Sequence, residues 1–232
     1  MSDFRTGPQT LPIEALGVGS RAQFILRTYN HLFGAIVLFT LLEVAFFKSG
    51  LAGSMAQAML SVNWLFVLGG FMVVSWLATR FANGSSSLGM QYVGLLAYVV
   101  AQAVLFVPLL FVANYYAPGT IQAAGGCTMV GFAGLTAVAF VTRKDFSFLR
   151  AIMMWVGVLA LGAIVAGAIF GFQLGTWFSV LMVGVAGASI LYDTSNVILH
   201  YPEDRYVGAA LQLFASVALL FWYLLRIFSS RK

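Results

Sequence analysis

Seven long apolar runs are the feature that most constrains the fold of this chain. Each is close to or above the roughly 20 residues that a helix needs to cross a bilayer, and they lie near 22–47, 61–79, 88–113, 119–141, 149–172, 175–200 and 206–228. Only 8% of the 232 residues are charged, against about 25% in soluble domains. A segment in lipid must satisfy its own backbone hydrogen bonds, so such runs form helices. The sequence predicts an all-α integral membrane protein with seven transmembrane helices.

The predicted helices divide the chain into a membrane domain over 22–228, an N-terminal tail over 1–21 and a C-terminal tail over 229–232. The first twenty residues lack the continuous apolar core of a cleavable signal peptide. With seven crossings, basic residues gather on the side of the N-terminus, which the positive-inside rule assigns to the cytoplasm; they are Arg5, Arg21, Arg27, Arg80, Arg143, Lys144, Arg150 and Arg205. The opposite side has Lys48, Arg226, Arg231 and Lys232.

Several classes of function are disfavoured by composition. The single Cys127 excludes an internal disulfide, and two histidines without further cysteines form no zinc-binding cluster. The net charge of +5 lies in loops and chain ends rather than in a basic stripe with aromatics, so nucleic acid is not an expected partner. Within the spans the acidic residues are Glu43 and Asp193, in opposite halves of the membrane. We therefore expect membrane lipids as partners, no cofactor and no enzyme activity.

The segment "ILYDTSNVILH", residues 190–200, carries a polar stripe on the predicted sixth helix. Ser189, Asp193, Asn196 and His200 are spaced at i, i+4, i+7 and i+11, which places them on one helical face. A carboxylate near the centre of a spanning helix costs about 2.5–3.5 kcal/mol on insertion scales, so it usually faces protein or a water-filled path. Asp193 is the first candidate for a functional residue.

A buried carboxylate pairs with a cation, coordinates a metal or takes up a proton. Arg80, at the cytoplasmic end of the second predicted span, is the best-placed positive partner for Asp193, and the alternative is that Arg80 only anchors its helix at the headgroups. Glu43 is expected at the outer interface near Lys48, with lining of a path as the alternative. His31 is expected to be a packed ring with its hydrogen bonds satisfied.

Three stretches together resemble the Bax inhibitor-1/YccA family, also called the transmembrane Bax inhibitor motif family. They are "LRTYNHLFGAIVLFT" in the first span, "VTRKDFSFLR" between the fourth and fifth, and "LYDTSNVI" in the sixth. The resemblance covers about seven eighths of the chain. It implies six helices surrounding a central seventh, and a pH-responsive calcium leak built on an aspartate in the sixth span, another in the seventh, and an arginine of the second span.

On this resemblance Asp193 matches the first aspartate and Arg80 is the counterpart of the arginine. Ser216 occupies the place of the second aspartate. Two carboxylates can share a proton, whereas a carboxylate and a hydroxyl cannot. Calcium prefers several oxygen ligands, mostly charged ones, so Asp193 is at most a weak calcium ligand. We assign ion or proton sensing to Asp193, Arg80, Ser216, Asn196 and His200.

Two functions follow from this resemblance, and a third reading needs no transport. The first is a stress-related, pH-sensitive cation leak with calcium as the transported ion, weakened by Ser216. The alternative is a modulator of a membrane-anchored AAA protease, acting through the helices and the N-terminal tail without transport. In the third, the bundle is structural and Asp193 fixes helix register. The short loops and the absence of a signal peptide favour a bacterial inner membrane.

Overall fold

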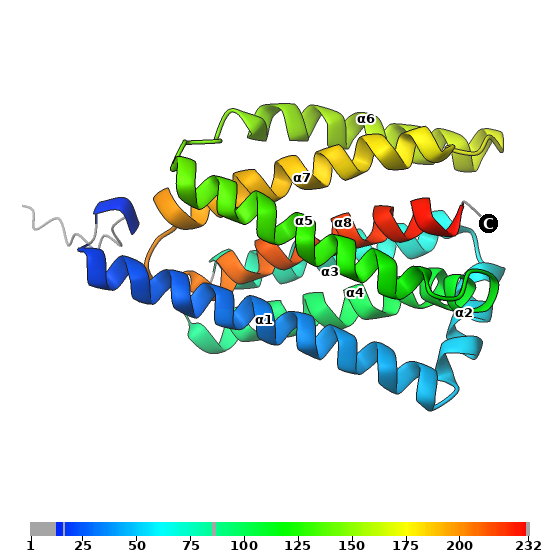
Figure 1. Ribbon diagram of the computed structural model, residues 1–232. Coiled ribbons are helices and arrows are strands. Elements are labelled where there is room, and N and C mark those ends of the chain that lie inside the picture. The colour runs from blue at the N-terminus through cyan, green and yellow to red at the C-terminus, as the bar shows by residue number, and fades with distance from the viewer. Residues whose placement is uncertain (1–12, 16, 85–86, 231–232) are drawn as a thin grey trace, which may run out of the picture.

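The computed structural model describes residues 13–15, 17–84 and 87–230. This part contains a single 3-10 turn, η1 (Ile13–Ala15), and the helices α1 (Val18–Lys48), α2 (Leu51–Ser61), α3 (Trp64–Gly84), α4 (Leu88–Tyr116), α5 (Thr120–Thr142), α6 (Leu149–Phe170), α7 (Thr176–Leu199) and α8 (Tyr206–Ser229). All but α2 are long and apolar enough to cross a membrane. They run roughly along one common direction (Figure 1). The predicted all-α membrane fold with seven spans is confirmed.

The short helix α2 is an element that the sequence pattern did not reveal. It follows the left-handed turn at Gly50 (φ 78°) and has 11 residues, about half the number that a membrane span needs. Its small residues Ala52 and Ala56 are buried against Val107 of α4. The helix therefore packs at the end of the bundle between α1 and α3, and α3 begins at Trp64 rather than at 61.

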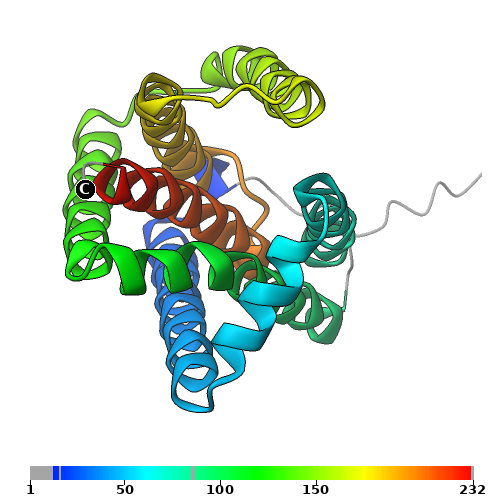
Figure 2. The ribbon, with the colours of Figure 1, turned by 90° about the vertical axis from the view of Figure 1, so that its right-hand side faces the viewer.

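Helix α8 is the centre of the bundle. In its most apolar window 67% of the residues are buried, the highest share among the seven long helices, and it contacts α1, α3, α4, α5 and α7. Figure 2 shows it enclosed by the neighbouring helices. Lipid offers no hydrophobic drive for such packing, so close van der Waals contact and interhelical hydrogen bonds must hold the centre together. The predicted central seventh span is confirmed.

Helix α6 lies at the periphery instead. Only 6% of its apolar window is buried, and its contacts are with α7 and, less extensively, α3. In Figures 1 and 2 it runs along the outside of the bundle beside α7. Large apolar side chains such as Trp155 and Val158 remain exposed on it, as expected for a helix that faces lipid.

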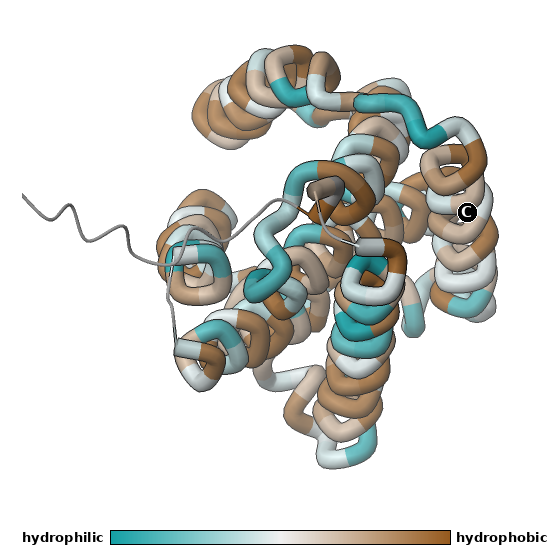
Figure 3. The backbone as a smooth tube through the Cα atoms, turned by 90° about the vertical axis from the view of Figure 1, so that its left-hand side faces the viewer, coloured by the Kyte–Doolittle hydropathy of each residue, from teal (hydrophilic) through white to brown (hydrophobic). Residues whose placement is uncertain are grey.

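Helices α1 and α8 place the two chain ends on opposite sides of the bundle (Figure 1). We call the side at which α1 begins the N-terminal end. The connections α3–α4, α5–α6 and α7–α8 all lie at this end, and Figure 3 shows hydrophilic segments gathered there while the helix bodies are mainly hydrophobic. Helix α8 therefore runs from this end to the opposite end of the bundle, as the predicted seventh span requires.

The 3-10 turn η1 fastens the start of the described chain to this end. The Ile13 side chain is fully buried in the main core cluster with Phe24 and against Tyr201, and the Ile13 N–H donates a 2.9 Å hydrogen bond to the Tyr201 carbonyl. Part of the predicted tail over 1–21 is thus docked, and α1 begins at Val18 rather than at 22. Residues 1–12 of the tail lie outside the described residues, as do 231–232 of the predicted C-terminal tail.

Candidate functional site

The structure brings Asp193 and Ser216 together at the contact between α7 and α8. The Ser216 hydroxyl donates a 2.5 Å hydrogen bond to Asp193 Oδ2. Both residues are buried, with 9% of Asp193 and 5% of Ser216 exposed. Hydrogen bonds to a charged acceptor are stronger than those between neutral groups, and a medium of low dielectric constant strengthens them further. The pair therefore holds the central helix in register with α7.

Two tyrosines lie in the neighbourhood of this pair. Tyr98 of α4 and Tyr201 after α7 both lie within electrostatic range of Asp193. The Tyr98 ring meets Phe214 of α8 edge to face, with centroids 6.1 Å apart. A buried carboxylate that accepts one hydroxyl hydrogen bond is poorly solvated, so its charge state responds strongly to any cation or proton that reaches it.

The structure does not bring Arg80 to Asp193. The Arg80 side chain is exposed, and its guanidinium lies over the Trp76 ring of the same helix, 5.5 Å from the centroid. Within the described residues the ion pairs are His200–Asp145 and Arg205–Asp204, and neither Arg80 nor Asp193 takes part. A long side chain at a helix end reaches the interface at low cost. Arg80 thus follows the anchoring alternative.

The other members of the predicted stripe contact different neighbours along α7. Ser189 donates to Met153 Sδ of α6 at 3.2 Å and to the Val185 carbonyl at 3.0 Å. His200 Nε2 lies 3.4 Å from Asp145 Oδ2. Asn196 is half-buried. The stripe is one face of the helix, but α6, α8 and the α5–α6 connection cover successive parts of it.

Ser195 is a buried residue that the sequence reasoning missed. Its hydroxyl donates to the Lys144 carbonyl at 3.1 Å and accepts from the Phe146 N–H at 3.2 Å. One side chain therefore fastens the α5–α6 connection to α7. The signal was present in the sequence, because the two stretches "VTRKDFSFLR" and "LYDTSNVI" that carry the family resemblance meet at this contact.

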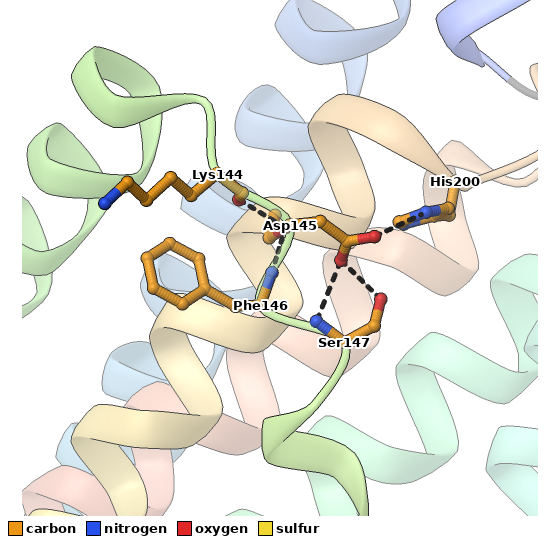
Figure 4. A network of polar contacts seen from close by, with 6 residues as sticks. Lys144, Asp145, Phe146, Ser147 and His200 are labelled. Carbon is orange, nitrogen blue, oxygen red and sulfur yellow. Dashed lines mark hydrogen bonds and ion pairs between the residues drawn. The ribbon is translucent and has the colours of Figure 1, made fainter.

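Asp145 organises the exposed side of the same connection, as Figure 4 shows. It accepts hydrogen bonds from the Ser147 hydroxyl at 2.5 Å and from the Ser147 N–H at 2.8 Å, and it faces His200. The Ser147 hydroxyl, the Ser147 N–H and the nearby His200 hold the pKa of this carboxyl below its ordinary value. Asp145 is therefore ionised across the physiological range and can orient the His200 ring.

Two polar residues of α1 differ in how well they are satisfied. His31 Nε2 contacts the Tyr92 hydroxyl at 2.7 Å and Nδ1 contacts the Arg27 carbonyl at 2.6 Å, which confirms a packed ring with hydrogen bonds satisfied. Glu43 is only 7% exposed, and within the described residues neither carboxylate oxygen has a hydrogen-bond partner. The prediction that Glu43 lies at the outer interface is wrong, because its side chain is buried inside the bundle.

The donor set at Asp193 fits calcium poorly. Calcium takes 6–8 oxygen ligands with several carboxylates among them. The neighbour of Asp193 is instead a neutral hydroxyl, which donates its hydrogen bond to the carboxylate. In the described part of the chain there is no group of three or more His, Cys, Asp or Glu side chains that could hold a metal ion. Asp193 and Ser216 would supply two oxygen ligands of unequal strength.

A cavity of about 500 Å³ lies between α3, α4, α6 and α8, and its lining includes neither Asp193 nor Ser216. Its lining includes Tyr98 and Gln102 near the middle of the bundle and Gln173 and Arg226 toward the opposite end. The Gln102 amide oxygen is buried without a hydrogen-bond partner in the described chain. The cavity therefore carries polar groups from the far end of the bundle to Tyr98, which is within electrostatic range of Asp193.

The fold and the site define a seven-helix integral membrane protein with a carboxylate–hydroxyl pair that joins its central helix α8 to α7. The family model described as inhibitor of apoptosis-promoting Bax1 matches residues 21–232. The chain belongs to this family.

Curated relatives match over a shorter stretch. The modulator of FtsH protease YccA of Escherichia coli K12 is 34% identical over 113 residues, which are 47% of this chain and 51% of that protein. An uncharacterized protein of Pseudomonas aeruginosa is 38% identical over 111 residues, or 47% of this chain and 49% of that protein. An uncharacterized membrane protein of Vibrio cholerae is 29% identical over 124 residues, or 49% and 53%. The chain spans about half the length of the curated relatives it matches.

Proposed function

We propose that this chain is a non-enzymatic modulator of a membrane-anchored AAA protease in a bacterial inner membrane. The printed name of the E. coli relative, modulator of FtsH protease, supports the partner class. The structural observation that carries the proposal over calcium transport is the hydrogen bond from Ser216 to Asp193. A single carboxylate bonded to a neutral hydroxyl lacks the ligand set of a calcium path, while a regulator needs only a well-held bundle and a contact surface.

The N-terminal tail is the part of the chain that we assign to contact with the protease. Its docked end, Ile13, is bonded to the Tyr201 carbonyl, and Tyr201 lies within electrostatic range of Asp193. Force or binding on the tail therefore acts next to the connection between α7 and α8. This contact offers a physical route from a partner at the N-terminal end to the centre of the bundle.

The test is copurification with the host FtsH-type protease, together with the half-life of a membrane substrate of that protease. Deletion of residues 2–12 leaves Ile13 in place and is expected to abolish both association and the effect on half-life. Asp193→Asn is the matched variant outside the tail, and it should associate as the wild type does. Unchanged association and turnover after the deletion would refute the proposal.

A pH-sensitive cation leak is the second candidate, and the cavity beside Tyr98 favours it. The cavity has polar lining groups from Arg226 and Gln173 to Gln102 and Tyr98, and Tyr98 is the lining residue within electrostatic range of Asp193. Protonation of Asp193 would remove the charge to which Ser216 donates, and so weaken the contact between α7 and α8. In this version Asp193 is the proton sensor and the α7–α8 contact is the gate.

Flux into proteoliposomes at neutral and mildly acidic pH tests the leak, with calcium and potassium measured separately. If Asp193 is the sensor, wild-type flux responds to pH and Asp193→Asn removes the response. Ser216→Asp restores a second carboxylate and is expected to raise calcium flux over potassium flux. No flux above that of empty liposomes in the wild type would exclude the leak and leave protease modulation standing.

We further propose that the N-terminal end of the bundle faces the cytoplasm, as the distribution of Lys and Arg suggests. Two single-cysteine variants, Arg80→Cys and Lys48→Cys, each made together with Cys127→Ser, report the two ends of the bundle. An impermeant maleimide added to whole cells should label the cysteine at Lys48 and spare the one at Arg80. The reverse pattern would invert the topology.

A further inference from the structure

A polar pocket at the N-terminal end lies outside the Asp193–Ser216 pair. It has a volume of about 390 Å³ and is formed by the start of α6, the last turns of α7 and the residues that follow α7. We call it the corner pocket, and its lining includes Ser147, Arg150, Tyr192, Asn196, His200 and Tyr201. The Arg150 guanidinium, the Asn196 amide and the tyrosine hydroxyls are able to donate hydrogen bonds to an anion, whereas the Ser147 hydroxyl and His200 Nε2 are engaged by Asp145.

Arg150 supplies charge that nothing in the described protein neutralises. Its side chain is exposed, and within the described residues it makes neither an ion pair nor a side-chain hydrogen bond. The Asp145 carboxylate, beside the pocket-lining residues Ser147 and His200, accepts from Ser147 and faces His200. Asp145 therefore holds the ring of His200 at the pocket edge, and Arg150 remains available to an anion.

An apolar track leads from Arg150 along α6 into the membrane. Met154 and Val158 follow Arg150 by four and eight residues, one and two turns along the same helical face. They are 63% and 65% exposed. A molecule with a phosphate at Arg150 and an acyl chain along Met154 and Val158 would match both the polar pocket and the track.

We infer that the corner pocket binds the phosphate of an anionic phospholipid, with an acyl chain lying along the exposed face of α6. Guanidinium groups recognise phosphate oxygens through paired N–H donors. The further basic residues at this end, Arg143, Lys144 and Arg205, raise the local concentration of anionic lipid without lining the pocket. The bound lipid would fasten the peripheral α6 to the end of α7.

Native mass spectrometry of the detergent-purified protein tests the site, because in a micelle only a built site retains lipid. The protein is equilibrated with equimolar phosphatidylglycerol and phosphatidylcholine of identical chains, and retained lipids are counted. The wild type is expected to retain phosphatidylglycerol selectively. Arg150→Gln should reduce its affinity about fivefold, the equivalent of about 1 kcal/mol per basic residue.

Lys144→Gln is the matched control, since it removes one positive charge from the same connection. Figure 4 shows the Lys144 side chain extending away from His200 and Ser147, so this variant should reduce phosphatidylglycerol retention much less than Arg150→Gln does. Equal losses in Lys144→Gln and Arg150→Gln would mean general surface charge and overturn the proposal. So would retention of both lipids without selectivity.

A second arm separates lipid from free phosphate. Met154→Gln alters the track without touching the pocket lining and is expected to weaken phosphatidylglycerol retention while leaving any binding of inorganic phosphate unchanged. If millimolar inorganic phosphate displaces the lipid fully, or if Met154→Gln has no effect, the ligand is a soluble phosphate compound and the lipid assignment fails.

Discussion

Ser216 of the central helix α8 donates a 2.5 Å hydrogen bond to Asp193 of α7, and both residues are buried. The pair joins the most buried span of the bundle to the helix that carries the polar stripe. The Ser216 hydroxyl gives the buried Asp193 carboxylate a hydrogen-bond donor without placing a second charge beside it. The contact is therefore a structural fastener first, and it becomes a switch only if a proton or a cation reaches Asp193.

Removing the Ser216 hydroxyl should loosen this fastener. Interhelical hydrogen bonds in membranes contribute about 0.6 kcal/mol on average, and those to charged groups reach about 1.5–3 kcal/mol in soluble proteins. We expect Ser216→Ala to lower the free energy of unfolding by about 1–2 kcal/mol, measured by denaturation in mixed detergent micelles.

Ser189→Ala is the control for that experiment, because Ser189 lies on the same stripe but bonds to a thioether and to its own helix. Its effect should stay near a few tenths of a kcal/mol.

Asp193→Asn keeps an acceptor for Ser216 and removes the buried charge, so its free energy of unfolding should equal or exceed that of the wild type. A large loss in Asp193→Asn would mean that the ionised form makes a further favourable contact.

Much of the fold could be predicted from the sequence, because span length and helical period are local properties. The apolar runs gave the seven helices, and the spacing around Asp193 identified a buried face before any contact was known. Helix α2 was not predicted, because its 11 residues are apolar enough to resemble the edge of a span but too few to cross the membrane. Its position depends on the packing of Ala52 and Ala56 against Val107, which is far away along the chain.

The candidate site was predicted less completely, because it depends on which helices meet. Ser216 is polar and mid-span, so its place on the family pattern suggested the contact with Asp193. The depth of Arg80 makes it the best-placed cation for Asp193 but equally allows it to anchor its helix at the headgroups; depth does not fix direction, and the side chain lies over Trp76. Ser195 is a serine in a helix with no pattern of its own, and only the fold of the α5–α6 connection gives it partners.

Gly94 should tolerate no side chain. A Cβ at Gly94 would lie 2.5 Å from the Ala78 carbonyl oxygen and 2.8 Å from the Ala82 nitrogen, so α3 and α4 would have to separate. We expect Gly94→Ala to lower the free energy of unfolding by about 1–3 kcal/mol. Gly69→Ala is the control, because a Cβ there meets nothing within 4 Å, and it should be neutral or slightly stabilising. Equal effects of the two variants would contradict the close contact.

Ile13 should determine whether the N-terminal turn stays docked. Its side chain is fully buried and its N–H is bonded to Tyr201. Replacing a buried isoleucine with alanine costs about 2 kcal/mol or more, so Ile13→Ala should speed amide hydrogen exchange over residues 13–15 by about 30-fold or more. Ala15→Ser, at an exposed position of the same turn, should leave exchange unchanged. Rapid exchange in the wild type would show that the turn is not held.

The contact between Asp145 and Ser147 predicts a pH dependence at the α5–α6 connection. Ser147, and to a smaller extent His200, lower the pKa of Asp145 from its ordinary value of 3.8. A carboxyl whose pKa is lower in the folded state stabilises the fold above the unfolded pKa and loses this contribution as the pH falls through the folded pKa. Carboxyl chemical shifts of labelled aspartate should therefore show Asp145 ionised at pH 5 and titrating only below its ordinary range.

Ser147→Ala removes the hydroxyl donor and should return the midpoint of the Asp145 titration toward 3.8, whereas Ser147→Thr keeps a hydroxyl and should preserve the low value. A wild-type midpoint at or above 3.8 would mean that the connection does not adopt this turn in solution, and with it the orientation of His200 at the corner pocket would be lost.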